Sequence, residues 1–95
     1  MRDYEIMYIV KSDLSDEQFE ALEKRLYGAI TDHDGTIERV DNWGNREFAY
    51  EIDHMRKGHY VVVNCRANRH GINEFERLCR ISKDVIRYMV IRKED

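Results

Sequence analysis

The hydrophobic residues of this chain change their spacing several times, and this change is the feature that most restricts its fold. β-Branched and aromatic runs predict extended strands, whereas apolar residues at three- and four-residue spacing predict amphipathic helices. The helical spacing covers residues 16–31 and 69–81. The strand pattern covers residues 4–10, 37–40, 46–52, 59–66 and 85–92.

Local signals mark the ends of these segments. Ser15 and Gln18 fit a capping box at the start of the first helix. Gly35 is expected to end that helix by adopting a left-handed conformation. Residues 41–45 are irregular and predict a β-bulge that splits the second strand, and residues 53–58 predict a polar turn into the third.

The predicted order is β-α-β-β-α-β, with no proline to interrupt an element. Two split βαβ units of this kind give a ferredoxin-like α+β fold. We therefore expect a four-stranded antiparallel sheet in strand order 4-1-3-2, with both helices on one face. The whole chain, residues 1–95, is expected to form a single domain.

Composition limits the functions that remain. A net charge of -3 argues against nucleic-acid binding by bulk attraction, so any RNA contact needs a local cluster of cations. The N-terminal residues contain no long apolar run, which predicts neither a signal peptide nor a membrane span and favours a cytosolic location. Cys65 and Cys79 are widely separated and are expected to be reduced thiols in the core.

The side-chain alternation of the strands predicts an apolar surface on the sheet face away from the helices. One parity, such as Val61, Val63 and Cys65, is expected to face the helices. The other leaves apolar residues outward, namely Met7, Ile9, Tyr60, Val62, Met89 and Ile91. This favours a docking surface for a partner. The alternatives are ordinary apolar residues on both faces of a small sheet, or a homodimer through the same face.

The same strand order predicts a cationic end of the sheet. It brings the start of the first strand beside the ends of the third and fourth, which gathers Arg2, Arg66, Arg92 and Lys93. Such a cluster can bind phosphates. Arg46 and Arg87 lie elsewhere on the sheet and could bind phosphate or a carboxylate. For any single arginine, solvated surface charge is the simpler interpretation.

No pattern of catalytic or metal-binding residues emerges. His54, His59 and Cys65 lack a fourth ligand, and the loop 11–15 has no glycine to hold phosphate. We therefore expect no enzyme activity, cofactor, metal or small-molecule substrate. A small acyl-phosphate hydrolase of the same topology remains the least favoured alternative.

An RNA-recognition module shares this topology and ranks second. Such modules stack bases on outward aromatic residues of the first and third strands. Here the relevant third-strand positions are His59, Val61 and Asn64, and Tyr8 has the parity that faces the helices.

The second strand carries a more specific signature over residues 43–52, which read Trp-Gly-Asn-Arg-Glu-Phe-Ala-Tyr-Glu-Ile. This stretch resembles the W-G-x-R-x-x-A-Y-x-I pattern of the bacterial small ribosomal subunit protein six family. The resemblance extends along the chain through Arg2, Tyr4 and Glu5, through Gly58 and Tyr60, and through residues 85–92.

The resemblance implies a non-enzymatic protein that pairs with small-subunit protein eighteen and binds the central domain of small-subunit ribosomal RNA. It implies RNA contacts by Arg2, Arg87 and Arg92, to which the cationic end adds Arg66 and Lys93. It implies a partner-facing edge at Trp43, Arg46, Phe48 and Tyr50, next to Met7, Tyr60, Met89 and Ile91 of the outer sheet face. Trp43 could equally be a plug at the edge of the core.

Two departures from the family stand out. Many members have proline where this chain has Glu51, and many have a long acidic tail where this chain stops at Asp95. Contacts made by such a tail are not carried over.

Overall fold

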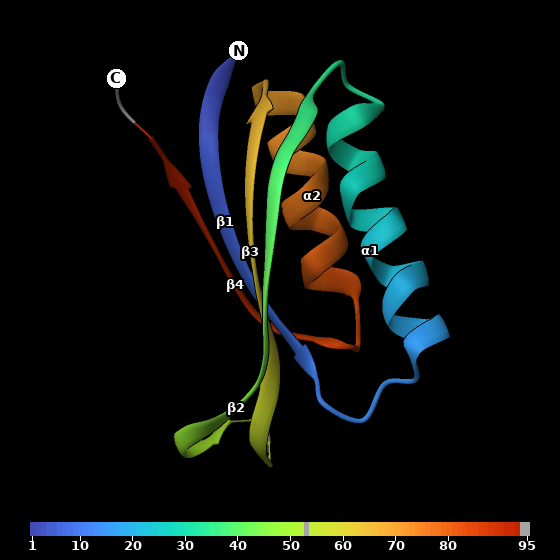
Figure 1. Ribbon diagram of the computed structural model, residues 1–95. Coiled ribbons are helices and arrows are strands. Elements are labelled where there is room, and N and C mark those ends of the chain that lie inside the picture. The colour runs from blue at the N-terminus through green and yellow to red at the C-terminus, as the bar shows by residue number, and fades with distance from the viewer. Residues whose placement is uncertain (53, 94–95) are drawn as a thin grey trace.

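The two strands with the most buried residues lie in the middle of the sheet. The computed structural model describes residues 1–52 and 54–93. Its elements are β1 (Arg2–Lys11), α1 (Asp16–Thr31), β2 (Thr36–Ile52), β3 (Met55–Ala67), α2 (Arg69–Ile81) and β4 (Val85–Arg92). The sheet order is β2-β3-β1-β4 with antiparallel neighbours throughout, and both helices cover one face (Figure 1). The predicted ferredoxin-like fold is confirmed.

The core lies between the helices and one face of the sheet. The residues of β1 and β3 with the predicted inward parity are fully buried, namely Ile6, Tyr8, Val10, Val61, Val63 and Cys65. Tyr88 and Val90 of β4, which have the same predicted parity, are partly buried against this core. Leu26, Ile30 and Phe75 close the core from the helices, since their helical spacing places them on the faces toward the sheet. The other sheet face therefore has no helix over it.

A hydrogen-bonded cluster of polar side chains borders the core where β1 meets α1. The Tyr8 hydroxyl donates to Glu23 Oε2 at 2.9 Å and lies 2.6 Å from the Tyr27 hydroxyl, which also donates to Glu23 at 2.8 Å. These bonds tie β1 to α1. Burial is the main cause that raises the pKa of the Tyr8 phenol far above its usual range.

Both cysteines are free and buried, as expected for core thiols. Burial raises the pKa of the Cys65 thiol to about 11 and that of Cys79 to about 12. Neither thiol is therefore ionised near neutral pH. Among the described residues, no helix is long and apolar enough to cross a membrane.

Both ends of α1 lie where predicted, but the left-handed residue that follows the helix is not the predicted one. The Ser15 hydroxyl accepts from the Gln18 amide at 3.1 Å, and the Gln18 side chain accepts from the Ser15 amide at 3.0 Å, which completes the capping box. The left-handed residue after α1 is Asp34, with φ of 65°, and not Gly35. Asp34 tolerates this conformation because short polar side chains adopt it more readily than others do.

Gly35 serves a different purpose, which is close packing. A Cβ at this position would lie 2.7 Å from the Ile30 carbonyl oxygen and 2.8 Å from the Arg66 carbonyl oxygen. The glycine thus allows the chain leaving α1 to pass tightly beside β3.

The hairpin of β2 and β3 is longer and more continuous than predicted. β2 is a single strand with register shifts, and the expected bulge falls between Asn42 and Gly44, where Gly44 has φ of 77°. The predicted polar turn over residues 53–58 is wrong in extent, because β3 already begins at Met55; Asp53 lies outside the described residues. Cross-strand pairing continues to Ile52 and Met55, so the hairpin extends beyond the helices (Figure 1).

Candidate nucleic-acid and partner interface

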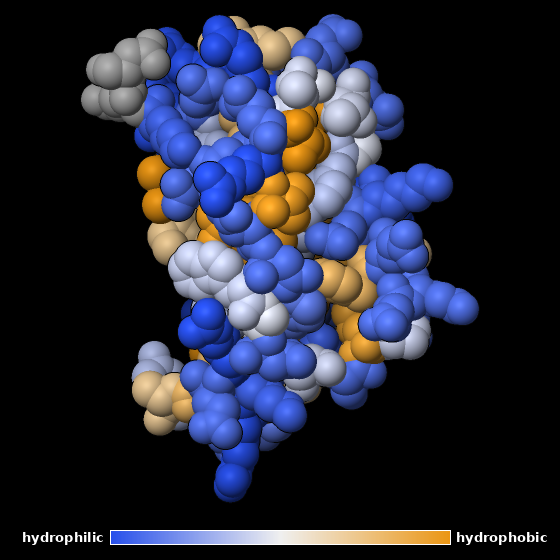
Figure 2. Space-filling view, viewed as in Figure 1, coloured by the Kyte–Doolittle hydropathy of each residue, from blue (hydrophilic) through white to orange (hydrophobic). Residues whose placement is uncertain are grey.

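The outer sheet face, which we define as the side away from the helices, carries the apolar residues that the alternation predicted. The register aligns Met7 with Val62 on β3 and with Met89 on β4. Met89 and Ile91 are each 48% exposed. Hydrophobic side chains are visible on this side of the molecule, at the left margin of Figure 2. Exposed apolar residues at adjacent positions are typical of an interaction surface.

Part of this face is covered within the chain itself. Ile9 and Val62 are only 6% exposed, although no helix lies over them. A Cβ at Gly58 would lie 2.5 Å from Ile9 Cγ2 and 2.9 Å from Phe48 Cζ, so Phe48 of the hairpin packs beside Ile9. The expectation that the whole face is bare is therefore wrong for Ile9 and Val62.

Aromatic residues of β2 and β3 form a cluster on the outer face. The rings of Trp43 and Tyr60 are stacked, with centroids 6.4 Å apart and planes at 8°, and the Phe48 ring lies 6.2 Å from Tyr60. The bulge at Gly44 allows this contact, because it places Trp43 beside the strand position paired with Tyr60. Trp43 remains substantially exposed, so it does not plug the core.

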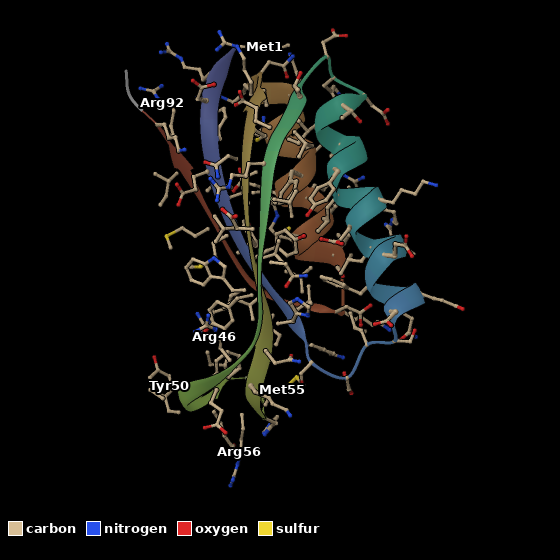
Figure 3. All side chains as sticks on the ribbon, in the orientation of Figure 1. Met1, Arg46, Tyr50, Met55, Arg56 and Arg92 are labelled. Atoms are coloured by element: carbon tan, nitrogen blue, oxygen red, sulfur yellow. The ribbon has the colours of Figure 1, made fainter. Side chains whose placement is uncertain are left out.

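The remaining predicted partner residues extend from this cluster. The Arg46 guanidinium lies 5.9 Å from the centre of the Trp43 ring, within the range of a cation–π contact. Tyr50 is 75% exposed and lies toward the end of the hairpin (Figure 3). Seven of the eight predicted residues thus belong to one surface: Met7, Trp43, Arg46, Phe48, Tyr60, Met89 and Ile91. Tyr50 lies farther along the hairpin.

A shallow hollow of about 300 Å³ lies on the outer face between β1 and β4. It is lined by Met7, Ile9, Arg87, Tyr88 and Met89. The register pairs Arg87 with Ile9, which places this arginine on the outer face and away from the cationic end of the sheet.

The structure brings Arg2, Arg66, Arg92 and Lys93 to one end of the sheet, as the strand order predicted, but it divides them between two sides. Arg66 and Lys93 lie on the outer side, and both have acidic neighbours. Arg66 Nη1 is 3.5 Å from Asp3 Oδ1, and Lys93 Nζ is 3.8 Å from Glu5 Oε2 and also donates to Asn64. Their charges are therefore largely balanced on this side.

Arg2 and Arg92 lie on the helix side of the same end. The register pairs Arg2 with the buried Ala67 and Tyr4 with Arg92, and Tyr4 packs against the helix-covered core. Figure 3 shows Arg92 at the end of β4, near Met1 at the start of the chain.

A groove of about 320 Å³ lies on this helix side, between α2 and the strands β1 and β4. Its polar lining consists of Tyr4, Arg69, Asn73, Glu76 and Arg92. Sequence reasoning missed Arg69 and Asn73. Their i, i+4 spacing on α2 could have indicated a shared face, but only the sheet register shows that this face meets Arg92.

Other sequence-based alternatives gain no geometric support. Tyr8 and Val61 are fully buried and cannot stack on bases as an RNA-recognition module requires. Within residues 1–52 and 54–93, no group of three or more acidic, histidine or cysteine side chains could hold a metal ion.

Comparison with known proteins gives consistent results. The model of a family described as Ribosomal protein S6 matches residues 3–92. The small ribosomal subunit protein bS6 of Desulforudis audaxviator is 46% identical over 94 residues, which cover 99% of this chain and 100% of that protein. The bS6 protein of Carboxydothermus hydrogenoformans is 44% identical over 94 residues, covering 99% and 98%.

A solved structure agrees with the fold. The crystal structure of 30S ribosomal protein S6 from Thermotoga maritima has a TM-score of 0.89 and 32% identity, covering 97% of this chain and 87% of that one. Matching sequence and matching architecture extend over nearly all of the chain. The protein therefore belongs to the ribosomal protein S6 family of the bacterial small subunit.

Proposed function

We propose that this chain, acting as a single domain, is a structural constituent of the small ribosomal subunit in the bacterial cytoplasm. It binds the central domain of small-subunit ribosomal RNA together with small-subunit protein eighteen, and it performs no catalysis. Membership of the S6 family supports the ribosomal role. The observation that supports binding of both a protein and RNA is that the exposed apolar sheet face and the cationic sheet end are separate surfaces.

The outer face is assigned to the protein partner. Met89 and Ile91 are exposed beside the aromatic cluster of Trp43, Phe48 and Tyr60, and covering them would remove apolar area from water. Met7 and Arg46 border the same surface, and Tyr50 on the hairpin extends it.

The cationic end is assigned to RNA. Arg2, Arg66, Arg92 and Lys93 can neutralise backbone phosphates there, and Arg87 offers a further cation on the outer face. With a net charge of -3, the chain alone should bind RNA weakly, so the partner is needed for a stable complex.

The test is reconstitution from purified components. The chain, protein eighteen and a central-domain RNA fragment are mixed and resolved by native gel electrophoresis. We expect a ternary complex, with much weaker RNA binding when either protein is omitted. Failure of protein eighteen to enhance RNA binding would contradict the proposal.

A matched pair of variants tests the outer face. Ile91→Ser removes an exposed apolar side chain from this face, whereas Ile81→Ser removes a similarly exposed one, 57% accessible, from the end of α2. We expect roughly fivefold weaker affinity for protein eighteen with Ile91→Ser, because an interface loses about 1 kcal/mol of apolar burial. Ile81→Ser should stay within about twofold of the unsubstituted chain. Equal affinities for the two variants would argue against docking on this face.

The RNA-recognition alternative predicts a different result. A free-standing module would bind short single-stranded RNA without a partner and would lose that binding in Tyr60→Ala. We expect the chain alone to bind such RNA only weakly.

A further inference from the structure

The described residues bring different sets of charged groups to the two sides of the cationic sheet end. On the outer side, each cation has a carboxylate beside it, since Arg66 pairs with Asp3 and Lys93 lies near Glu5. An incoming phosphate would have to compete with these carboxylates and would be repelled by them.

The helix side of the same end has more positive charge. Arg2 and Arg92 lie there, and Arg69 of α2 adds a third guanidinium. Among the described residues that line the groove, Glu76 is the one carboxylate, and it lies seven residues along the helix from Arg69. Seven residues of helix correspond to about 10 Å along the axis. A phosphate near Arg69 would therefore lie at the end of the groove away from Glu76.

The groove also offers neutral hydrogen-bonding groups. The Asn73 side chain and the Tyr4 hydroxyl line it beside the arginines. An amide and a phenol suit a ribose hydroxyl or a base edge next to a phosphate, and guanidinium groups suit the phosphate itself. This combination fits a nucleotide of an RNA chain better than a carboxylate of an acidic peptide.

We propose that the groove between α2 and β4 is the RNA-binding site at this end of the sheet, with Arg69 and Asn73 as contact residues beside Arg2 and Arg92. A sugar–phosphate segment of the RNA enters the groove on the helix side, where Arg69 and Arg92 hold a phosphate from two elements. Arg66 and Lys93, balanced by Asp3 and Glu5, contribute less. This inference rests on the proposed RNA-binding function.

The position of the groove has a further consequence for the complex. It opens on the helix side, whereas the apolar residues Met89 and Ile91 lie on the outer face. RNA and a protein partner can therefore occupy the chain together without competing for the same residues.

The test uses Arg69→Gln with a control on the same helix. Arg77→Gln removes the same charge from α2, but Arg77 lies outside the groove and is paired with Glu74 at 2.7 Å. Arg69 and Arg77 are both exposed, so both substitutions should leave the fold intact. Affinity for the central-domain RNA fragment is measured with protein eighteen present, over a series of salt concentrations.

We expect Arg69→Gln to bind RNA about tenfold more weakly, as for the loss of one charge-assisted contact. The slope of log affinity against log salt should fall by about 0.7 to 0.9, the value for one phosphate contact. Asn73→Ala should weaken binding without changing the slope. Arg77→Gln should stay within about twofold of the unsubstituted chain, and Arg66→Gln should weaken RNA binding less than Arg69→Gln does. Affinity for protein eighteen without RNA should be the same in all variants.

The possible outcomes distinguish failure of the groove assignment from failure of the proposed function. If the ternary complex forms but Arg69→Gln behaves like Arg77→Gln, the groove assignment is overturned and the proposed function stands. If Arg66→Gln is weakened as much as Arg69→Gln, RNA binding is not confined to the helix side and the inference is again overturned. If the unsubstituted chain forms no complex with RNA, the proposed function fails, and the inference fails with it.

Discussion

At the scale of single residues, the two glycines near the end of α1 show that the same amino acid can serve opposite needs. Gly28 lies inside the helix, where an added Cβ would meet nothing closer than Asp32 Oδ2 at 3.8 Å. Gly35 lies after the helix, where an added Cβ would lie within 2.8 Å of two backbone oxygens. Gly28 is thus free to be replaced, whereas Gly35 is required where the chain leaving α1 passes close beside β3.

This contrast predicts opposite effects of one substitution. Gly28→Ala should raise the free energy of unfolding by about 0.5 to 1 kcal/mol, because alanine loses less backbone entropy in a helix. Gly35→Ala should lower it by about 1 to 3 kcal/mol, because the backbone must shift to admit the Cβ. Urea denaturation of the two variants measures both effects. A Gly35→Ala chain as stable as the unsubstituted one would contradict the close packing.

At the scale of elements, the bounds of α1, α2 and β4 could be predicted because their signals are local. Side-chain periodicity, the Ser15 cap and the run of residues 85–92 depend only on neighbours in sequence. The long β2–β3 hairpin could not be delimited in this way. Polar residues such as Arg56 and Lys57 predict a turn from sequence, yet both lie within β3, and Lys57 pairs with Glu47 in a ladder whose length depends on the facing strand.

In the candidate site, too, some features could be predicted from the sequence and others could not. The end of the sheet that holds Arg2, Arg66, Arg92 and Lys93 follows from strand order and could be predicted. Their division between two sides depends on register, in which a shift of one residue moves a side chain to the opposite face. The groove beside α2 depends on how that helix lies over the strands, which the spacing of Arg69 and Asn73 alone does not determine.

The hairpin carries its own prediction about local stability. Its outer part extends beyond the helices. There Glu47 pairs with Lys57 and Ile52 with Met55, and none of these four residues pairs with β1, whereas residues 60–63 lie between β1 and β2. Amide hydrogen exchange should therefore be faster in the outer hairpin than in the inner part of β3.

The edge strand β4 provides a control for this measurement. It also pairs on one side only, but α2 contacts it. Slower exchange in β4 than in the outer hairpin would identify core coverage as the cause. Equal protection along the whole of β3 would contradict the prediction.

At the scale of the whole molecule, the core holds ionisable groups that stay protonated when the chain is folded. Burial raises the pKa of Tyr8, and it raises those of Cys65 and Cys79 to about 11 and about 12. In the unfolded chain, the thiols ionise near pH 9.0 and the phenol near pH 10.0. Above these values the folded chain binds more protons than the unfolded chain, so rising pH favours unfolding.

We therefore expect the free energy of unfolding to be unaffected by these groups below pH 9.0 and to fall above it, more steeply above pH 10.0. Each group lowers the free energy of unfolding by roughly 1.4 kcal/mol per pH unit over the pH range in which it is ionised in the unfolded chain but protonated in the folded chain. Urea denaturation across this range measures the slope. Cys79→Ala should make the fall of the free energy of unfolding with pH less steep between pH 9.0 and about pH 12, by the contribution of one thiol. An unchanged slope would argue against a protonated buried thiol.

The pairing of β1 with β4 brings the described ends of the chain together, since the Lys93 amide donates to the Asp3 carbonyl at 2.9 Å (Figure 1). A purification tag or fluorophore fused to either terminus would consequently lie next to Arg2 and Arg92. Such an attachment would shield the surface that binding assays are meant to probe, so labels for those assays belong on the solvent side of α1, for example at the exposed Lys24.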